Sequence, residues 1–280
     1  MIDLDFLSNL TAKAGETILE VYNSTSGAMQ EEGISSHSLA RKRAYDILRS
    51  GLQSRYPEIP AISEEQKDTP YSTRKEWPRF WLFNPLDGGE GFQQRNGEFT
   101  VNIALIEGFM PVFGAICLPV SGLLYAAARG AGCWKTENGI RYPLQVTAFS
   151  ADRPIRVVVS RPPVSPDVNS LIELLPGSSV AINRGSALKF CALAAGEADF
   201  YPQLDATWEW DTAAGQALVM EAGGVVAGVK GESFTYNKPD LRNGPFLVAP
   251  SLTWLQEMDV LNYPEKLANW KFEVCAKSCR

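Results

Sequence analysis

Three acidic segments of this 280-residue chain have residue types suited to binding a metal ion. Glu64 and Glu65 are adjacent, Asp87 follows a short apolar stretch, and Asp211 stands at the start of an expected helix. Carboxylate oxygens are the ligands that hard divalent cations prefer. Taken singly, the three segments also fit a solvated loop, a tight turn and a helix N-cap. Their combination is what favours a site.

The apolar pattern predicts the elements that carry these segments. Apolar residues recur at helical spacing over 2–21, and a second helical pattern covers 39–56. The polar stretch 27–38 between them predicts a loop. Residues 80–83 predict a short strand that runs into Asn84-Pro85-Leu86-Asp87, which places these residues at the strand's carboxyl end.

The second half of the chain has a different pattern from the first. Apolar segments separated by glycine and proline over 100–127 predict an antiparallel meander. After residue 146, expected strands at 155–160, 180–183 and 200–201 alternate with expected helices at 168–175, 187–195 and 211–222. We therefore expect an N-terminal α+β half over residues 1–150, a C-terminal α/β half over 151–280, and a cleft between them.

Composition limits the possible partners. The chain is 45% hydrophobic, which suffices for a sizeable core, and its net charge is −6. A negative surface repels phosphate backbones, so we expect no nucleic-acid partner, although a local basic pocket can still bind a small anion. The N-terminus lacks the pattern of a signal peptide, and no run of about 18 apolar residues occurs, so we expect no membrane partner.

Five cysteines are scattered along the chain, and their odd number predicts a reducing, cytoplasmic location. Cys117 and Cys191 lie in apolar runs and are expected to be buried thiols. Cys275 and Cys279 are one helical turn apart, but no second pair of zinc ligands lies near them in the sequence. We interpret that segment as an ordinary tail.

The acidic segments together resemble the signature of the inositol monophosphatase superfamily. That signature combines Ile-Ser-Glu-Glu, a strand into Asp-Pro-Leu-Asp-Gly-Thr, and Trp-Asp-Thr-Ala-Ala-Gly. This chain has Ile62-Ser63-Glu64-Glu65, Asn84-Pro85-Leu86-Asp87-Gly88-Gly89 and Trp210-Asp211-Thr212-Ala213-Ala214-Gly215. Further segments, at residues 57–60, 95–106, 187–191 and 243–246, resemble the CysQ branch of 3'(2'),5'-bisphosphate nucleotidases.

The resemblance covers residues 1–250 and implies a layered α/β/α/β/α sandwich of the inositol monophosphatase and fructose-1,6-bisphosphatase type. It also implies a Mg²⁺-dependent phosphatase in which metal-bound water attacks phosphorus. The metal-ligand positions correspond to Glu64, Asn84, the Leu86 carbonyl, Asp87 and Asp211. The positions for the substrate anion correspond to Gly88, Gly89, Gly185, Ser186 and Lys189, near an expected helix start.

Three positions depart from the family pattern. Asn84 replaces an aspartate that bridges two metals, and an amide offers only one neutral oxygen. Gly89 replaces a threonine that orients the nucleophilic water, and Arg41 replaces an aspartate that polarises that threonine. A guanidinium at this place repels a divalent cation. We therefore predict that the Mg²⁺ expected from the family binds weakly or not at all.

These departures lead to our main hypothesis. The chain binds a phosphate- or sulfate-bearing nucleotide or a sugar-like ligand, but Mg²⁺-dependent hydrolysis of phosphomonoesters is lost or strongly impaired. It is then a pseudophosphatase or a repurposed metal-free enzyme whose catalytic residues are Arg41, His37 and Glu64. In that enzyme, Arg41 holds an anionic group and His37, the only histidine, moves a proton. His37 also fits a loop histidine without a role.

The alternative hypothesis is a slow but genuine Mg²⁺-dependent nucleotidase that hydrolyses 3'-phosphoadenosine 5'-phosphate to AMP. A third hypothesis is a protein-binding partner with a vestigial pocket. Under the first two hypotheses the ligand is a small anion. We expect a monomer or a homodimer, and we interpret Trp208 and Trp210 as packing residues.

Overall fold

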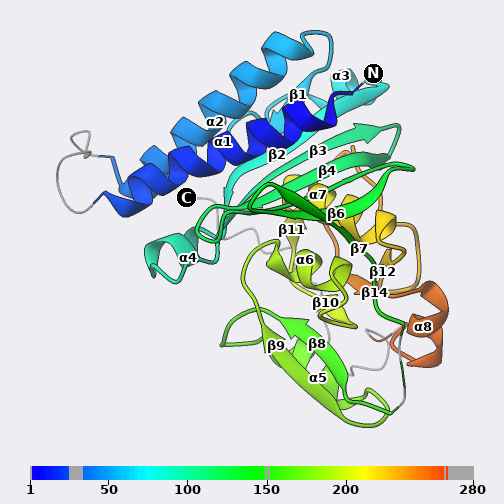
Figure 1. Ribbon diagram of the computed structural model, residues 1–280. Coiled ribbons are helices and arrows are strands. Elements are labelled where there is room, and N and C mark those ends of the chain that lie inside the picture. Colours follow the sequence, from blue (N-terminus) through cyan, green and yellow to red (C-terminus); the bar gives the residue numbers. More distant parts are fainter. Residues whose placement is uncertain (1, 25–33, 149, 151, 262, 264–280) are drawn as a thin grey trace.

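The computed structural model describes residues 2–24, 34–148, 150, 152–261 and 263, and the chain folds into five stacked layers. Figure 1 shows, from the top, a helix pair, a large sheet and a second helix pair, with the smaller sheets and two further helices below them. The expected α/β/α/β/α sandwich is therefore confirmed. Among the described helices, none is both long and apolar enough to cross a membrane.

The first layer consists of α1 (Leu4–Asn23) and α2 (Ser36–Arg55), which lie side by side on one face of the large sheet. Both expected helices are confirmed. The helix α2 begins earlier than expected because the side chain of Ser35 accepts a hydrogen bond from the N–H of Ser38. His37 therefore lies in the first turn of a helix, and the prediction that it lies in a loop is wrong.

The large sheet has seven strands that follow one another in sequence order, and all but the first pair are antiparallel. The expected meander is confirmed. The strands are β1 (Ala61–Ser63), β2 (Arg79–Asp87), β3 (Thr100–Glu107), β4 (Met110–Leu118), β5 (Leu123–Ala128), β6 (Gly132–Glu137) and β7 (Ile140–Leu144). The hairpin of β6 and β7 extends the meander. Its turn, Asn138-Gly139, has positive φ at both residues, as expected for this dipeptide.

A register shift in β2 sets the direction of its polar end. Asn84 pairs with Asn102 of β3, but Asp87 pairs with Thr100, so three residues of β2 are matched by two of β3. Because side chains alternate between the faces of a strand, this extra residue returns Asp87 to the face that Asn84 occupies. That face is the one covered by α7 (Glu209–Glu221).

The helix α7 lies close against the sheet, and a glycine permits that approach. A Cβ atom at Gly114 of β4 would lie 2.5 Å from the carbonyl oxygen of Ala214. The apolar face formed by Phe80 and Leu82 packs in the same core as Leu218 of α7. The close packing brings the first turn of α7 to the carboxyl end of β2.

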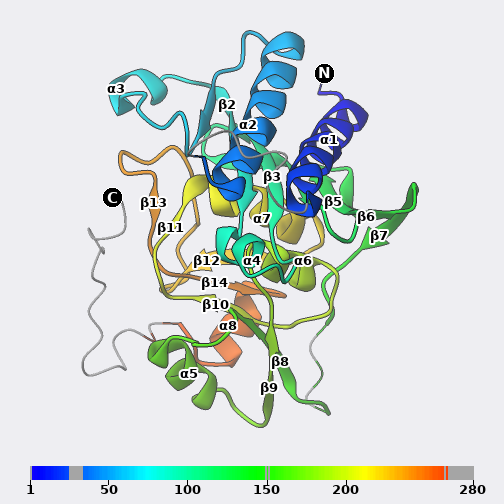
Figure 2. The same ribbon diagram turned by 90° about the vertical axis from the view of Figure 1, so that its left-hand side faces the viewer.

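The C-terminal half contains the remaining layers (Figure 2). All the strands and helices expected there are confirmed to within a few residues. The strands are β8 (Ile155–Val159), β9 (Ser179–Asn183), β10 (Tyr201–Gln203), β11 (Thr207–Trp208), β12 (Val225–Gly228), β13 (Arg242–Asn243) and β14 (Phe246–Ala249). The helices besides α7 are α5 (Pro166–Glu173), α6 (Leu188–Ala194) and α8 (Leu252–Glu257), while α3 (Tyr71–Arg74) and α4 (Gly89–Gln93) precede β2 and β3.

The chain leaves the large sheet after Leu144 and enters the next one at Ile155. Because α7 of the second half packs on the sheet of the first, the division into halves near residue 150 stays a prediction. Cys117 and Cys191 are buried free thiols, as expected, and burial raises the pKa of both. The predicted tail with Cys275 and Cys279 lies outside the described residues.

Candidate active site

Asp211 and Asn84, which are 127 positions apart, meet where α7 begins. The Asn84 amide Nδ2 donates to Asp211 Oδ1 at 2.8 Å, and Asn84 Oδ1 accepts from the N–H of Leu86 at 3.2 Å. The other oxygen of Asp211 accepts from the N–H of Trp208 at 2.9 Å. Asp211 is the third residue of α7, so the N-cap interpretation is wrong. Its carboxylate instead reaches back to the residue before the helix.

Asp87 lies beside this pair at the end of β2. Its Oδ2 accepts hydrogen bonds from the Ser186 hydroxyl and from the N–H of Ala187, the latter at 3.0 Å. Asp87 is also the principal charged neighbour of Asp211. Removal of Asp211 from bulk water and, secondly, the like charge of Asp87 raise the pKa of Asp211 to about 8. Two carboxylates therefore face each other without a cation bonded to Asp211 from any described side chain.

The predicted anion-binding loop is connected directly to Asp87. Ser186, in a left-handed conformation with φ of 52°, bonds to Asp87 and lies 2.8 Å from the Thr100 hydroxyl. The N–H of Gly185 donates to Glu98 at 2.8 Å. Gly88 has φ of 84°, and a Cβ there would lie 2.6 Å from the Glu98 carbonyl oxygen, so the turn requires glycine. Gly185 and Ser186 thus donate hydrogen bonds to the side chains of Glu98 and Asp87 in this structure.

Arg41 is engaged with two carboxylates. Its Nη1 lies 3.2 Å from Glu64 Oε1, and its Nε lies 3.2 Å from Glu65 Oε1. Burial raises the pKa of Glu65, and the nearby guanidinium opposes that shift. Glu65 belongs to this cluster although only Glu64 is predicted as a site residue, and the adjacency of the two glutamates is the signal for it. Arg41 offsets part of their negative charge.

His37 occupies the space next to Gly89. A Cβ atom at Gly89 would lie 2.6 Å from His37 Nε2, which is buried and has no hydrogen-bond partner within the described part of the chain. The imidazole packs edge-on against Phe92 at a centroid distance of 5.7 Å. Burial and then the charge of Arg41 lower the pKa of His37, so the imidazole is neutral at pH 7. Glycine at position 89 is thus matched to a histidine at position 37.

Two adjoining cavities open in front of Asp87. The smaller, of about 220 Å³, is lined by Asp87, Asp211 and Gln203, and the larger, of about 500 Å³, by Glu98 and Arg161. Lys189 lines both. Its side chain is only 7% exposed, and its Nζ lies 5.4 Å from the Tyr201 ring centroid. No hydrogen bond of Nζ is found among the described residues, so the ammonium can still bind an anion.

Arg161 is a cleft residue that no motif in the sequence indicates. Its Nε and Nη2 bind both oxygens of Glu98, at 2.6 and 2.7 Å. This bidentate pair holds the loop after β8 against the segment before β3 and forms one wall of the larger cavity. Burial lowers the pKa of Lys189, whereas Asp87, Glu98 and Asp211 oppose that shift.

Residues 3–257 match the sequence profile of the Inositol monophosphatase family. The chain belongs to the inositol monophosphatase family. It is 38% identical over 236 residues to the 3'(2'),5'-bisphosphate nucleotidase CysQ of Escherichia coli, a match that covers 83% of this chain and 93% of that protein. CysQ of Salmonella typhimurium is 39% identical over 235 residues, with the same coverage. The family resemblance seen in the sequence is confirmed.

Solved structures agree with this membership. The crystal structure of CysQ from Bacteroides thetaiotaomicron superposes with a TM-score of 0.78 at 33% identity, covering 88% of this chain and 97% of that one. The 2'AMP-bound SaIMPase-II, at 21% identity and a TM-score of 0.73, shares the fold. It covers 92% of both chains.

The donor set of this family member fits one divalent cation better than several. Asp87 and Asp211 are facing carboxylates with no cation bonded to Asp211 by the described residues. Asn84 turns its nitrogen toward Asp211, and Glu64 is paired with Arg41. Within the described ranges, no group of three or more His, Cys, Asp or Glu side chains is arranged as a metal cluster. The roles of the individual site residues, and the strength of Mg²⁺ binding, stay predictions.

Proposed function

We propose that this chain is a slow, Mg²⁺-dependent 3'(2'),5'-bisphosphate nucleotidase that acts on small nucleotides such as 3'-phosphoadenosine 5'-phosphate. The proposal is carried by the facing carboxylates Asp87 and Asp211 at one end of a cleft that also contains the Lys189 ammonium, for which the described residues provide no hydrogen-bond partner. The CysQ relatives favour this alternative hypothesis. No comparison supports the main hypothesis of a pseudophosphatase.

In the proposed reaction, Asp87 and Asp211 would hold Mg²⁺, which when bound supplies Lewis-acid activation of water and phosphate. The Ser186 hydroxyl and the Ala187 N–H fix the Asp87 carboxylate, and the Asn84 amide fixes that of Asp211. Lys189 projects into the same cavity and would bind the oxygens of the phosphate under attack.

Slow turnover follows from the same geometry. Position 89 carries no hydroxyl that could orient a water molecule, and the neutral His37 fills the adjoining space. Arg41 forms an ion pair with Glu64, and this pair weakens the attraction of Glu64 for a metal cation. Orientation of reactants contributes strongly to enzymatic rates, and the loss of a positioning group lowers the rate without removing the reaction.

The two cavities divide the substrate between them. The smaller one is next to the carboxylate pair and accommodates the phosphate to be removed. The larger one, about 500 Å³, is lined by polar groups of Gln94, Asn96 and Arg161, and it accommodates the rest of the nucleotide. A small anionic ligand and a cytoplasmic location fit this proposal, and so does a monomer or a homodimer.

Phosphate release from 3'-phosphoadenosine 5'-phosphate tests the proposal directly. We expect slow release that requires Mg²⁺, stops with EDTA and is absent from Asp211→Asn, with Escherichia coli CysQ as the active reference and inositol monophosphate as the substrate control. Release that is equally fast with EDTA would contradict the metal requirement. Calorimetric binding of the bisphosphate without any release would instead favour the pseudophosphatase, the second candidate, which the Arg41–Glu64 pair supports.

A further inference from the structure

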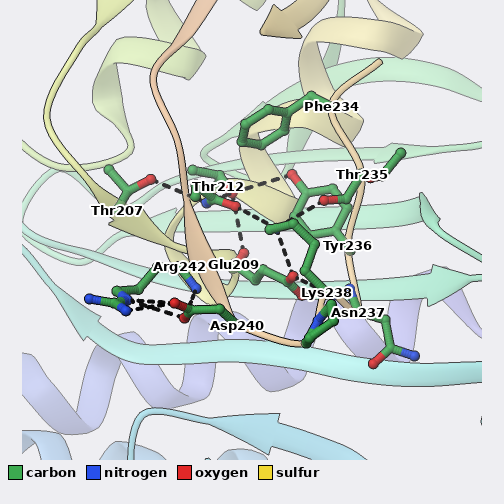
Figure 3. A network of polar contacts seen from close by, with 12 residues as sticks. Thr207, Glu209, Thr212, Phe234, Thr235, Tyr236, Asn237, Lys238, Asp240 and Arg242 are labelled. Carbon is green, nitrogen blue, oxygen red and sulfur yellow. Dashed lines mark hydrogen bonds and ion pairs between the residues drawn. The ribbon is translucent and has the colours of Figure 1, made fainter. Parts of the chain in front are cut away.

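A network of polar side chains connects the first turn of α7 to the loop before β13 (Figure 3), and Lys238 is at its centre. The Lys238 ammonium donates to Glu209 Oε1 at 2.7 Å, to Asn243 Oδ1 at 2.9 Å and to the Thr235 carbonyl at 3.0 Å. An ammonium group has three protons, so all of its donors are used. We propose that Lys238 is a positioning residue that fixes Asp211 at the cleft.

One arm of the network holds the start of α7. Glu209, two residues before Asp211, is completely buried. Its carboxylate accepts from Lys238 Nζ and from the N–H groups of Asn237 and Lys238, at 2.7 and 2.9 Å respectively. A buried carboxylate with this many donors has one stable position, and the backbone of the first helical turn is held with it.

The other arm holds the residues on either side of Asp211. Asn243 accepts from Lys238 and donates through Nδ2 to the hydroxyls of Thr207 and Thr212, at 3.2 and 3.0 Å. Both threonines line the smaller cavity together with Asp211. Lys238 is therefore connected to positions 207, 209 and 212, which enclose Asp211 in the sequence.

Asp211 depends on this external support. Its own hydrogen bonds come from two neutral donors, the Trp208 N–H and the Asn84 amide. The like charge of Asp87 opposes its approach to the cleft. Glu209 has a cation of its own in Lys238, so the network is complete without a ligand. Its placement assigns it the role of holding the neighbouring carboxylate.

The same loop also fastens a distant segment. Arg74 of α3 donates to Asn237 Oδ1 at 3.0 Å and to the Pro239 carbonyl at 2.7 Å, and Asn237 Nδ2 donates back to the Arg74 carbonyl. The loop of residues 235–243 is thus fixed on both sides. Because this loop is held in place, loss of the Lys238 ammonium should displace the first turn of α7 rather than change the conformation of the loop.

The activity arm of the test rests on the proposed function. Lys238→Met removes the ammonium, and Arg153→Met is its control because Arg153 likewise pairs with a completely buried carboxylate, Asp199, and neither of these two residues lines either cavity. We expect kcat on 3'-phosphoadenosine 5'-phosphate to fall about 10- to 100-fold in Lys238→Met only, as for lost supports of metal ligands. The Mg²⁺ concentration for half-maximal activity should rise, KM for the nucleotide should change little, and Lys238→Arg should recover most of kcat.

A second measurement does not depend on catalysis. Trp208 and Trp210 flank Glu209, and their rings stack with a centroid distance of 5.0 Å and an interplanar angle of 8°. Near-ultraviolet circular dichroism therefore reports the geometry of this turn. We expect Lys238→Met, and not Arg153→Met, to change that signal and to weaken calorimetric Mg²⁺ binding. The circular dichroism signal and Mg²⁺ binding still test the role of Lys238 if the wild-type protein releases no phosphate. That result would contradict the proposed function but not the role of Lys238.

Equal losses of kcat in Lys238→Met and Arg153→Met, or an unchanged near-ultraviolet signal and Mg²⁺ affinity in Lys238→Met, would overturn the assignment. Should Lys238→Met not fold, Asn243→Ala takes its place, because it leaves the Lys238–Glu209 pair intact and cuts only the connection to the threonines. The same changes of smaller size are expected there, and a wild-type profile would overturn the proposal.

Discussion

Glu209 and Asp211 are two residues apart on the same helical turn, yet their surroundings are opposite. Glu209 is completely buried and is bonded to the Lys238 ammonium and to two backbone N–H groups. Asp211 lines a cleft, and among the described residues no lysine or arginine forms an ion pair with it; the charged group with the largest effect on its pKa is Asp87. Glu209, the carboxylate with a structural role, is paired with a cation. A carboxylate left without a cation is available to a ligand, which is how perturbed groups indicate a functional site.

Removing the charge of Glu209, the carboxylate that is paired with Lys238, should have the largest effect on stability. Glu209→Gln keeps the shape but removes the charge that Lys238 faces, and the loss of one partner of a buried pair costs about 3 kcal/mol or more. Because the Lys238 side chain is 31% exposed, we expect the lower end of that range. Urea denaturation at pH 7 measures it, with Asp211→Asn as the comparison, which should lose only about 1 kcal/mol because one of the two hydrogen bonds that Asp211 accepts is removed. A loss below about 1 kcal/mol would contradict this account of the network.

Removing the charge of Asp211 should mainly affect activity. Asp211→Asn removes a predicted metal ligand, and we expect phosphate release to fall about 100-fold or more, beyond the loss typical of an outer supporting residue. Circular dichroism should show an intact fold. Retention of more than about a tenth of the wild-type rate would remove Asp211 from the proposed chemistry.

The pH dependence of stability separates the two kinds of carboxylate. Burial and Asp87 raise the pKa of Asp211 to about 8, so the folded state binds this proton more tightly than the unfolded state. Its contribution to stability is complete below the unfolded pKa, near 4, and is lost as the pH rises through about 8. Asp211→Asn should flatten this decline, and saturating Mg²⁺ should do the same in the wild-type protein.

Asp199 should show the opposite sign. Bonds from Arg153 and Arg156 lower its pKa far below the ordinary range against the effect of burial. Its contribution is therefore present above the unfolded pKa and is lost as the pH falls toward the folded one. Thermal denaturation between pH 3 and 9, with Asp199→Asn and Asp211→Asn compared, measures both. Parallel pH profiles of the two variants would contradict the distinction.

The match between Gly89 and His37 should produce an intermediate effect. Gly89→Thr introduces a Cβ atom 2.6 Å from His37 Nε2, and such overpacking costs about 1–3 kcal/mol. His37→Ala in the same chain should recover most of that cost, a coupling that a double-mutant cycle in urea measures. Restoring the family residues at positions 41, 84 and 89 therefore requires the change at position 37 as well. Additive effects of the two substitutions would show that the imidazole can move away freely.

The sequence predicts most elements of this fold because its apolar spacing is regular. The helical patterns over 2–21 and 39–56 and the strands after residue 100 all appear where expected. The start of α2 differs because a single side-chain hydrogen bond, from Ser38 N–H to Ser35 Oγ, extends the helix over polar residues. Such a capping bond competes with loop formation, and spacing alone does not decide between them.

The candidate site is predictable in composition but not in its contacts. Asp87 and Asp211 meet as the family resemblance implies, because the register shift in β2 directs Asp87 to the face of α7. The ion pairs of Arg41 with both glutamates, and the Lys238 network, join segments that are far apart in the sequence. No local pattern carries that information, since long-range pairs depend on how the layers stack.

Removing Arg41 should have the smallest effect on stability and gives the finest test of the comparison. The Arg41 side chain is 33% exposed and the Glu64 side chain is 41% exposed, so solvent screens their attraction. We expect Arg41→Met to change the free energy of unfolding by less than about 1 kcal/mol. Glu64 then loses its cation and comes to resemble Asp211. Calorimetry should consequently show tighter Mg²⁺ binding in Arg41→Met. Because Arg41 is committed to two carboxylates, binding of the bisphosphate should weaken little. A large loss of nucleotide affinity with unchanged Mg²⁺ affinity would instead place Arg41 on the substrate phosphate, as the main sequence hypothesis predicts.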